Sequence, residues 1–104
     1  MGESETIFKE ETITYIEKEL KEPPMYKVIL HNDDYTTMDF VIQVLETVFN
    51  KPHNEAFEIM LKVHKKGYGI CGFYPAEVAE TKVAIVHHLA SENEFPLKCS
   101  MEEV

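Results

Sequence analysis

The residue types most able to do chemistry in this chain stand together in the run Asn32-Asp33-Asp34-Tyr35-Thr36-Thr37-Met38. A primary ammonium group has three donors, so it needs acceptors on several sides when it leaves water. Asn32 and Asp33 offer such acceptors side by side. A charge pair about 4 Å apart is worth ~4 kcal/mol at an effective dielectric constant of ~20, before desolvation is subtracted. The run therefore predicts a receptor for a cation.

Two elements must hold this run in place. The preceding residues 26–30 are apolar and rich in β-branched side chains, which predicts a strand. From Met38 to Phe49, apolar residues recur at spacings of three and four, which predicts a helix with one buried face. We expect Thr36 to cap this helix and Asp39 to lie in its first turn, where the helix dipole favours an acid.

The rest of the chain predicts four further elements. A second helix is expected from His53 or Asn54 to Lys66, with Gly67 at its C-terminal end. Its buried side should consist of Ala56, Met60, Val63 and either Ile59 or Phe57. Residues 68–74 predict a strand, Pro75 should open a third helix, and residues 97–101 predict a final short strand. This order predicts an α+β fold, a β-α-α-β-α-β two-layer sandwich with three helices on a small three-stranded antiparallel sheet.

The length and composition predict one domain. The chain has 104 residues, of which 44% are hydrophobic, enough for a single modest core. Residues 1–22 hold seven acids and three lysines, a net charge of -4, and few apolar side chains. We therefore expect a mobile acidic N-terminal extension over residues 1–23 and one domain over residues 24–104.

Several classes of protein are disfavoured by the same composition. The net charge is -9 and every basic residue is a lysine, which argues against nucleic-acid binding. No apolar run reaches the ~20 residues of a membrane span, and no secretory signal is visible, so we expect a cytoplasmic protein that does not engage membranes. Cys71 and Cys99 form no C-x-x-C pair. We expect reduced thiols, no metal, no cofactor and a monomer.

The residues by themselves also allow plainer interpretations. Asn and Asp bond their own backbone in turns, so the run at 32–34 could be a turn and nothing more. His64 could be a helix residue whose ring bonds a carbonyl group. Methionine and valine at helical spacing are more often core than pocket. Composition and spacing leave these alternatives open.

The order of several motifs closely resembles the ClpS family, the adaptors of the bacterial Clp protease. The resemblance covers residues 23–104 and is carried by residues 23–30, 32–36, 60–64, 69–72, 76–84, 92–94 and 96–97. It implies an adaptor, not an enzyme, that binds N-degrons, which are proteins whose first residue is Leu, Phe, Tyr or Trp. It also implies delivery of these proteins to a Clp AAA+ unfoldase. Thr37 departs from the family pattern, because proline is common at this position.

The resemblance implies a role for each matching residue. Asn32, Asp33 and His64 would bind the free α-amino group and the first peptide unit. The pocket for the first side chain would be lined by Thr36, Met38, Val41, Met60, Val63 and Leu97, with Met38 as the gate that excludes Ile and Val. Glu77 and Lys82 would dock on the N-domain of the unfoldase. The N-terminal extension would engage the unfoldase during delivery.

Two other functions compete with this hypothesis. A metal-dependent hydrolase could use Asp33, Asp34 and His64, although no second histidine or nucleophile is placed to complete a site. A generic peptide-binding or helix-binding module could share the fold, because the same order of elements occurs in a ribosomal stalk domain. Binding that ignores the first residue of a peptide would favour the second of these.

Overall fold

The computed structural model describes residues 23–104, so the extension expected over residues 1–23 lies almost entirely outside the described residues. The elements follow in the order β1 (Met25–His31), α2 (Met38–Thr47), α3 (His53–Lys66), β2 (Tyr68–Pro75), α4 (Ala76–Glu92) and β3 (Lys98–Glu103). The predicted order of strands and helices is confirmed. In residues 23–104, no helix is both long and apolar enough to cross a membrane.

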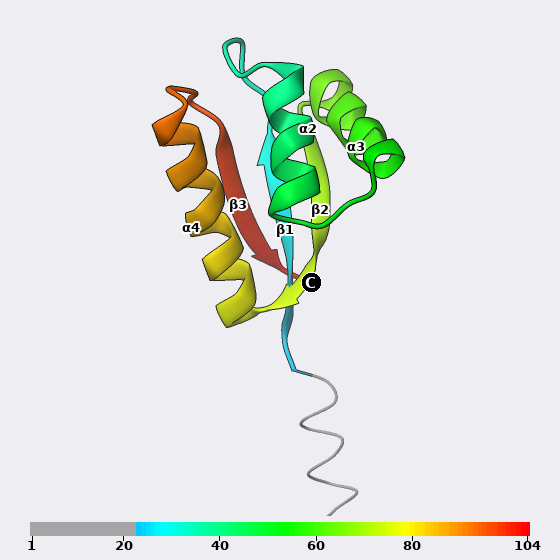
Figure 1. Ribbon diagram of the computed structural model, residues 1–104. Helices are drawn as coiled ribbons and strands as arrows, with labels where there is room; N and C mark the ends of the chain where they lie inside the picture. The colour runs from blue at the N-terminus through cyan, green and yellow to red at the C-terminus, as the bar shows by residue number, and fades with distance from the viewer. Residues whose placement is uncertain (1–22) are drawn as a thin grey trace, which may run out of the picture.

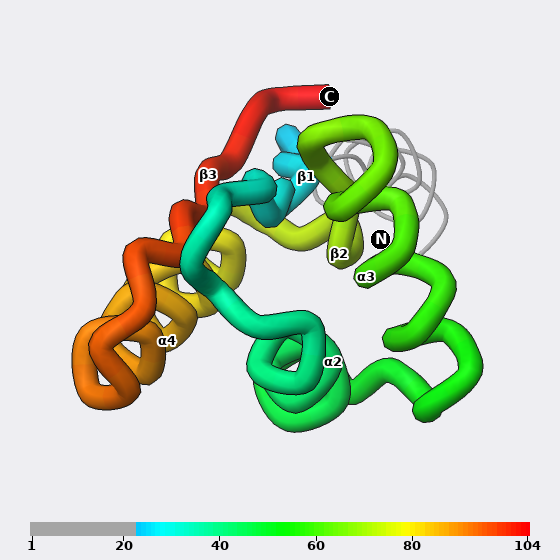
Figure 2. Tube along the Cα trace, turned by 90° about the horizontal axis from the view of Figure 1, so that it is seen from above, coloured from blue at the N-terminus to red at the C-terminus, as the bar shows by residue number. Residues whose placement is uncertain are grey.

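The three strands form one antiparallel sheet with the order β2-β1-β3. The helices all lie on one face of this sheet, as seen from the front in Figure 1 and from above in Figure 2. On the central strand β1, Val28 and Leu30 are fully buried and belong to the core, whereas Ile29 between them is buried outside the core cluster. The two-layer α+β sandwich is therefore confirmed.

The core lies between the sheet and the helices. Phe40, Val44 and Leu45 of α2 are buried there, and the Phe40 ring packs on Phe95 with ring centroids 4.8 Å apart. On α3 the buried residues are Ala56, Met60 and Val63, as the spacing predicted. Ile59 is partly buried against the core, whereas Phe57 is 45% exposed, which settles the choice that the sequence left open.

The helix starts differ from the sequence prediction by one residue. Thr37, not Thr36, caps α2, because its side chain accepts the N–H of Phe40 and its backbone is extended. The hydroxyl of Thr36 bonds Asp33 instead. Likewise, Pro75 is the last residue of β2, and α4 begins at Ala76. At the start of α2, residues 36 and 37 are both threonine. The local sequence pattern therefore could not tell which hydroxyl would cap the helix and which would bond to the loop.

Candidate functional site

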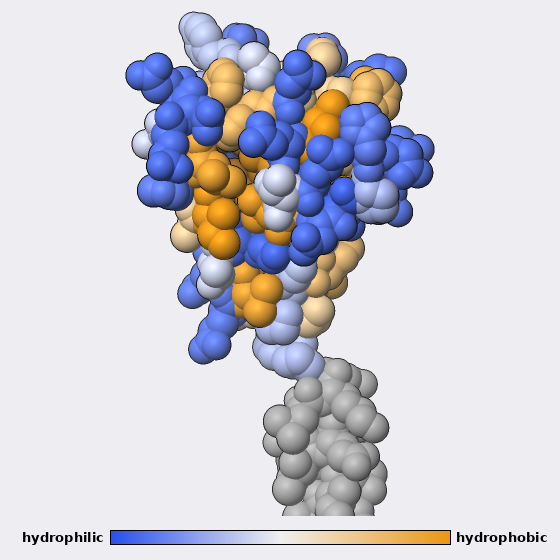
Figure 3. Space-filling model, in the orientation of Figure 1, coloured by the Kyte–Doolittle hydropathy of each residue, from blue (hydrophilic) through white to orange (hydrophobic). Residues whose placement is uncertain are grey.

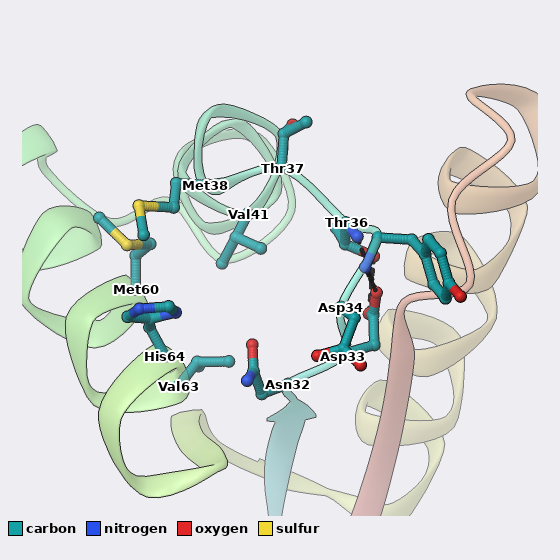
Figure 4. A pocket seen from close by; sticks show the side chains of 11 residues that line it. Asn32, Asp33, Asp34, Thr36, Thr37, Met38, Val41, Met60, Val63 and His64 are labelled. Carbon is teal, nitrogen blue, oxygen red and sulfur yellow. Dashed lines mark hydrogen bonds between the residues drawn. The ribbon is translucent and has the colours of Figure 1, made fainter.

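A hollow of about 400 Å³ opens where the loop after β1 meets the start of α2 and the second half of α3. Figure 4 shows the lining side chains that these three segments contribute, with Asn32, Val41, Met60, Val63 and His64 placed around the hollow. We call it the loop hollow, and its lining residues are Asn32, Asp33, Asp34, Tyr35, Thr36, Thr37, Met38, Val41, Met60, Val63 and His64. The structure thus brings together eight of the nine residues expected to hold the amino group or the first side chain.

Asn32 and His64 are brought together by the end of α3. Gly67 stops the helix in the left-handed conformation, with a φ of 92°, and its N–H donates to Val63 O at 3.0 Å. The carbonyl oxygen of Gly67 then accepts the N–H of Asn32 at 2.9 Å. Because His64 lies one turn before Gly67, this bond holds the end of β1 beside the imidazole. The Asn32 side chain points into the loop hollow (Figure 4).

The Asp33 carboxylate is bonded largely within its own loop. Oδ1 accepts the N–H groups of Tyr35 and Thr36 at 2.8 and 2.7 Å, and Oδ2 accepts the Thr36 hydroxyl at 2.7 Å. Partial burial pushes the pKa of Asp33 upward, but the bonds from Thr36 and Tyr35 outweigh it, so the pKa lies below its usual range. The group is therefore an anion near neutral pH. About four lone-pair sites exist on a carboxylate, so one remains for a ligand.

The sequence reasoning gave Asp34 no role in binding an amino group. Its side chain also lines the loop hollow and is exposed, and it accepts no hydrogen bond from residues 23–104. The signal was present, because a carboxylate next to a turn-forming Asp is free to face a ligand when the first one is used locally. Sequence alone could not say which of the two neighbours would close the turn.

The remaining wall of the loop hollow is apolar. Val41, Met60 and Val63 are 6%, 3% and 2% exposed, so they are fixed by the core. Met38, at the first position of α2, is 46% exposed and stands at the mouth, with its side chain turned toward Met60 (Figure 4). An apolar wall with carboxylate and amide acceptors at one side can bind an apolar group that carries a cation next to it.

Leu97 does not join these residues. It is buried in the core and lines a separate hollow beside His87 and Cys99. Its place in the pocket for the first side chain remains a prediction, although Leu97 is not among the residues that line the loop hollow. The reason is that Leu97 directly precedes β3, which lies on the opposite side of β1 from β2 and its neighbour α3.

Glu77 and Lys82 both lie on α4 but have different surroundings. Glu77 is exposed in the first turn. The Lys82 ammonium donates to Val48 O at 2.6 Å, at the C-terminal end of α2, and lies 5.6 Å from the centre of the Tyr74 ring. A cation at a helix C-terminus is favoured by the helix dipole, and α2 has no basic residue of its own in its last turn. Lys82 therefore joins α4 to α2.

The side chains that could ligate a metal ion lie next to the loop hollow and elsewhere in residues 23–104. Over residues 23–104, no three His, Cys, Asp or Glu side chains cluster in a way that could hold a metal ion. The same residues contain two free and buried thiols, and burial raises the pKa of Cys99 to about 12 and that of Cys71 still further. Such thiols are poor nucleophiles.

The chain is similar to known proteins of one family. The family model described as ATP-dependent Clp protease adaptor protein ClpS matches residues 21–100. A ClpS adapter protein of Oleidesulfovibrio alaskensis is 55% identical over 104 residues, covering all of both chains. Another, from Desulforapulum autotrophicum, is 57% identical over 103 residues and covers 99% of each chain.

A solved structure is similar as well. It is that of Agrobacterium tumefaciens ClpS2 bound to L-phenylalaninamide, with a TM-score of 0.77 and 35% identity, covering 80% of this chain and all of the other. The order of elements, the three-helix layer over the antiparallel sheet and these matches lead to one conclusion. This chain belongs to the ClpS family of Clp protease adaptor proteins.

Proposed function

We propose that the loop hollow binds the free N-terminus of proteins that begin with Leu, Phe, Tyr or Trp, and that the chain delivers them to a Clp AAA+ unfoldase. The observation that carries the proposal is the joining of amine acceptors and an apolar wall in one hollow of about 400 Å³. An N-terminal residue of this kind presents the matching pair, a cationic amine and an apolar side chain one carbon away. The ligand of the related ClpS2 structure, L-phenylalaninamide, is such a pair.

The amine would be held by Asn32, His64 and the acidic pair. Asp34 offers a carboxylate that accepts no hydrogen bond from the described residues 23–104, whereas Asp33 offers its charge and its one remaining acceptor site. The neutral imidazole of His64 can accept a further hydrogen bond. Met38, Val41, Met60 and Val63 would surround the first side chain, with Met38 at the mouth, and Thr36 would act mainly through Asp33.

The energies are adequate for a transient adaptor. Burial of a Leu or Phe side chain contributes about 1.5 to 3 kcal/mol, and each charge-assisted hydrogen bond contributes about as much. One side chain and two or three such bonds sum to about 4.5 to 12 kcal/mol before the entropy of association, at least about 4 kcal/mol, is subtracted. The net free energy of binding is then no stronger than about -8 kcal/mol, which is roughly micromolar affinity. This strength allows release once the unfoldase takes over.

The face for the unfoldase would include Glu77 and the apolar surface beside it. Figure 3 shows hydrophobic atoms gathered along α4 and between α4 and α2, and Val78 and Ile85 of α4 are each 42% exposed. Lys82 would support this face by joining the two helices. The acidic extension, outside the described residues, is proposed to engage the unfoldase during delivery.

Calorimetry with short peptides tests the proposal. We expect binding of peptides that begin with Leu or Phe, and weak binding of those that begin with Val or Arg. Nα-acetylation of the Leu peptide removes the positive charge and the donors that the acceptors of the loop hollow would pair with, so it should cost at least about 2 kcal/mol. Equal affinity for the acetylated and free peptides would refute amine recognition. Binding that ignores the first residue would favour a generic peptide-binding module.

A further inference from the structure

The strand under α3 carries a glycine that has no place for a side chain. Gly69 of β2 is buried and pairs with Leu30 of β1. A Cβ atom at Gly69 would come within 2.8 Å of Val63 Cγ2, 3.2 Å of Ile59 O and 3.3 Å of Ile59 Cγ2. The first distance is shorter than carbon atoms tolerate, so Val63 occupies the space that a side chain at position 69 would need.

Val63 has little freedom to move elsewhere. It is 2% exposed, and a β-branched side chain in a helix has one strongly preferred rotamer. The second atom in the way, Ile59 O, belongs to the backbone of α3 and cannot swing aside. Val63 therefore has the strand on one side and the loop hollow on the other. Any atom added at position 69 pushes it toward the hollow.

We infer that Gly69 is a specificity-determining residue that sets how large a first side chain the loop hollow accepts. The inference rests on the proposed function. Without a Cβ at position 69, Val63 sits deep against β2 and leaves room for an aromatic ring. With a Cβ at position 69, the Val63 side chain would be displaced into the loop hollow. Peptides that begin with a bulky residue would then lose more affinity than peptides that begin with Leu.

The test compares the affinities of peptides that begin with Phe, Trp or Leu in the full chain and in Gly69→Ala. We expect the ratio of Leu affinity to Trp affinity to rise roughly tenfold in the variant, the scale of one misplaced methyl group in an apolar pocket. Gly72→Ala is the matched control on the same strand. Its Cβ would meet the Tyr74 ring end, 2.6 Å from the hydroxyl oxygen, and Tyr74 does not line the hollow. The Gly72→Ala ratio should equal that of the parent.

A double variant separates the effect on the loop hollow from a general loss of folding. Val63→Ala removes the methyl groups that collide with the added Cβ, so Gly69→Ala/Val63→Ala should bind Trp peptides better than Gly69→Ala does. A cooperative thermal unfolding transition for each variant shows that it is folded. If the parent binds the peptides but Gly69→Ala leaves the Leu to Trp ratio unchanged, the inference is overturned and the proposed function stands. If the double variant recovers nothing, contact through Val63 is refuted. If the parent binds none of the peptides, the proposed function fails and this inference with it.

Discussion

The hydrogen bond between the Thr36 hydroxyl and Asp33 gives a sharp test of how the site is held. Thr36→Val keeps the shape of the side chain but removes the donor 2.7 Å from Oδ2. A hydrogen bond to a charged group contributes about 1.5 to 3 kcal/mol. Because Asp33 is only partly buried and water can reach the freed oxygen, we expect the lower part of that range, a loss of about 1.5 to 2 kcal/mol in the free energy of unfolding at pH 7.

The pH dependence of this loss identifies its cause. The folded-state pKa of Asp33 is depressed, so its stabilising effect is full above the ordinary value of 3.8 and disappears as the pH falls through the lowered folded value. The difference between Thr36→Val and the parent should therefore shrink in acid. Urea unfolding at pH 7 and at progressively lower pH measures it, with Thr36→Ser, which keeps the hydroxyl, as the matched control. A Thr36→Val protein as stable as the parent at pH 7, or equally destabilised throughout, would refute the reasoning.

Three other outcomes are expected. Asp34→Asn removes the Asp34 charge without breaking a hydrogen bond of the loop, so the binding free energy for a Leu peptide should weaken by about 1 to 2 kcal/mol while the melting temperature stays constant. A peptide titration at low and high salt measures this change. Unchanged affinity would argue that the charge of Asp33 is sufficient. Met38→Ala removes bulk at the mouth and should admit peptides that begin with Ile or Val, and the same order of preference as in the parent would count against the gate. Lys82→Met keeps the aliphatic stem but removes the cap on α2, so unfolding should become easier by about 1 kcal/mol, with the exposed Lys62→Met as control; equal losses in both would contradict the capping role.

Local pattern was sufficient for the order and type of the elements. The strand and helix periods are properties of neighbouring residues, so the sandwich, the end of α3 at Gly67 and the buried side of α3 followed from the sequence. Boundaries were less certain. The choice between Thr36 and Thr37 as the cap of α2 depended on Asp33, which took the Thr36 hydroxyl for the loop.

The sequence by itself determined that an amide and two carboxylates would stand between a strand and a helix, and resemblance to the ClpS family placed His64 beside them. Only the tertiary structure decided which carboxylate accepts no hydrogen bond from residues 23–104, because the bonds that occupy Asp33 depend on the conformation of its loop. It also decided that Leu97 lines another hollow and that Lys82 reaches Val48, 34 residues away in the chain. Contacts between distant segments depend on how whole elements pack, and no local spacing of residues carries that information.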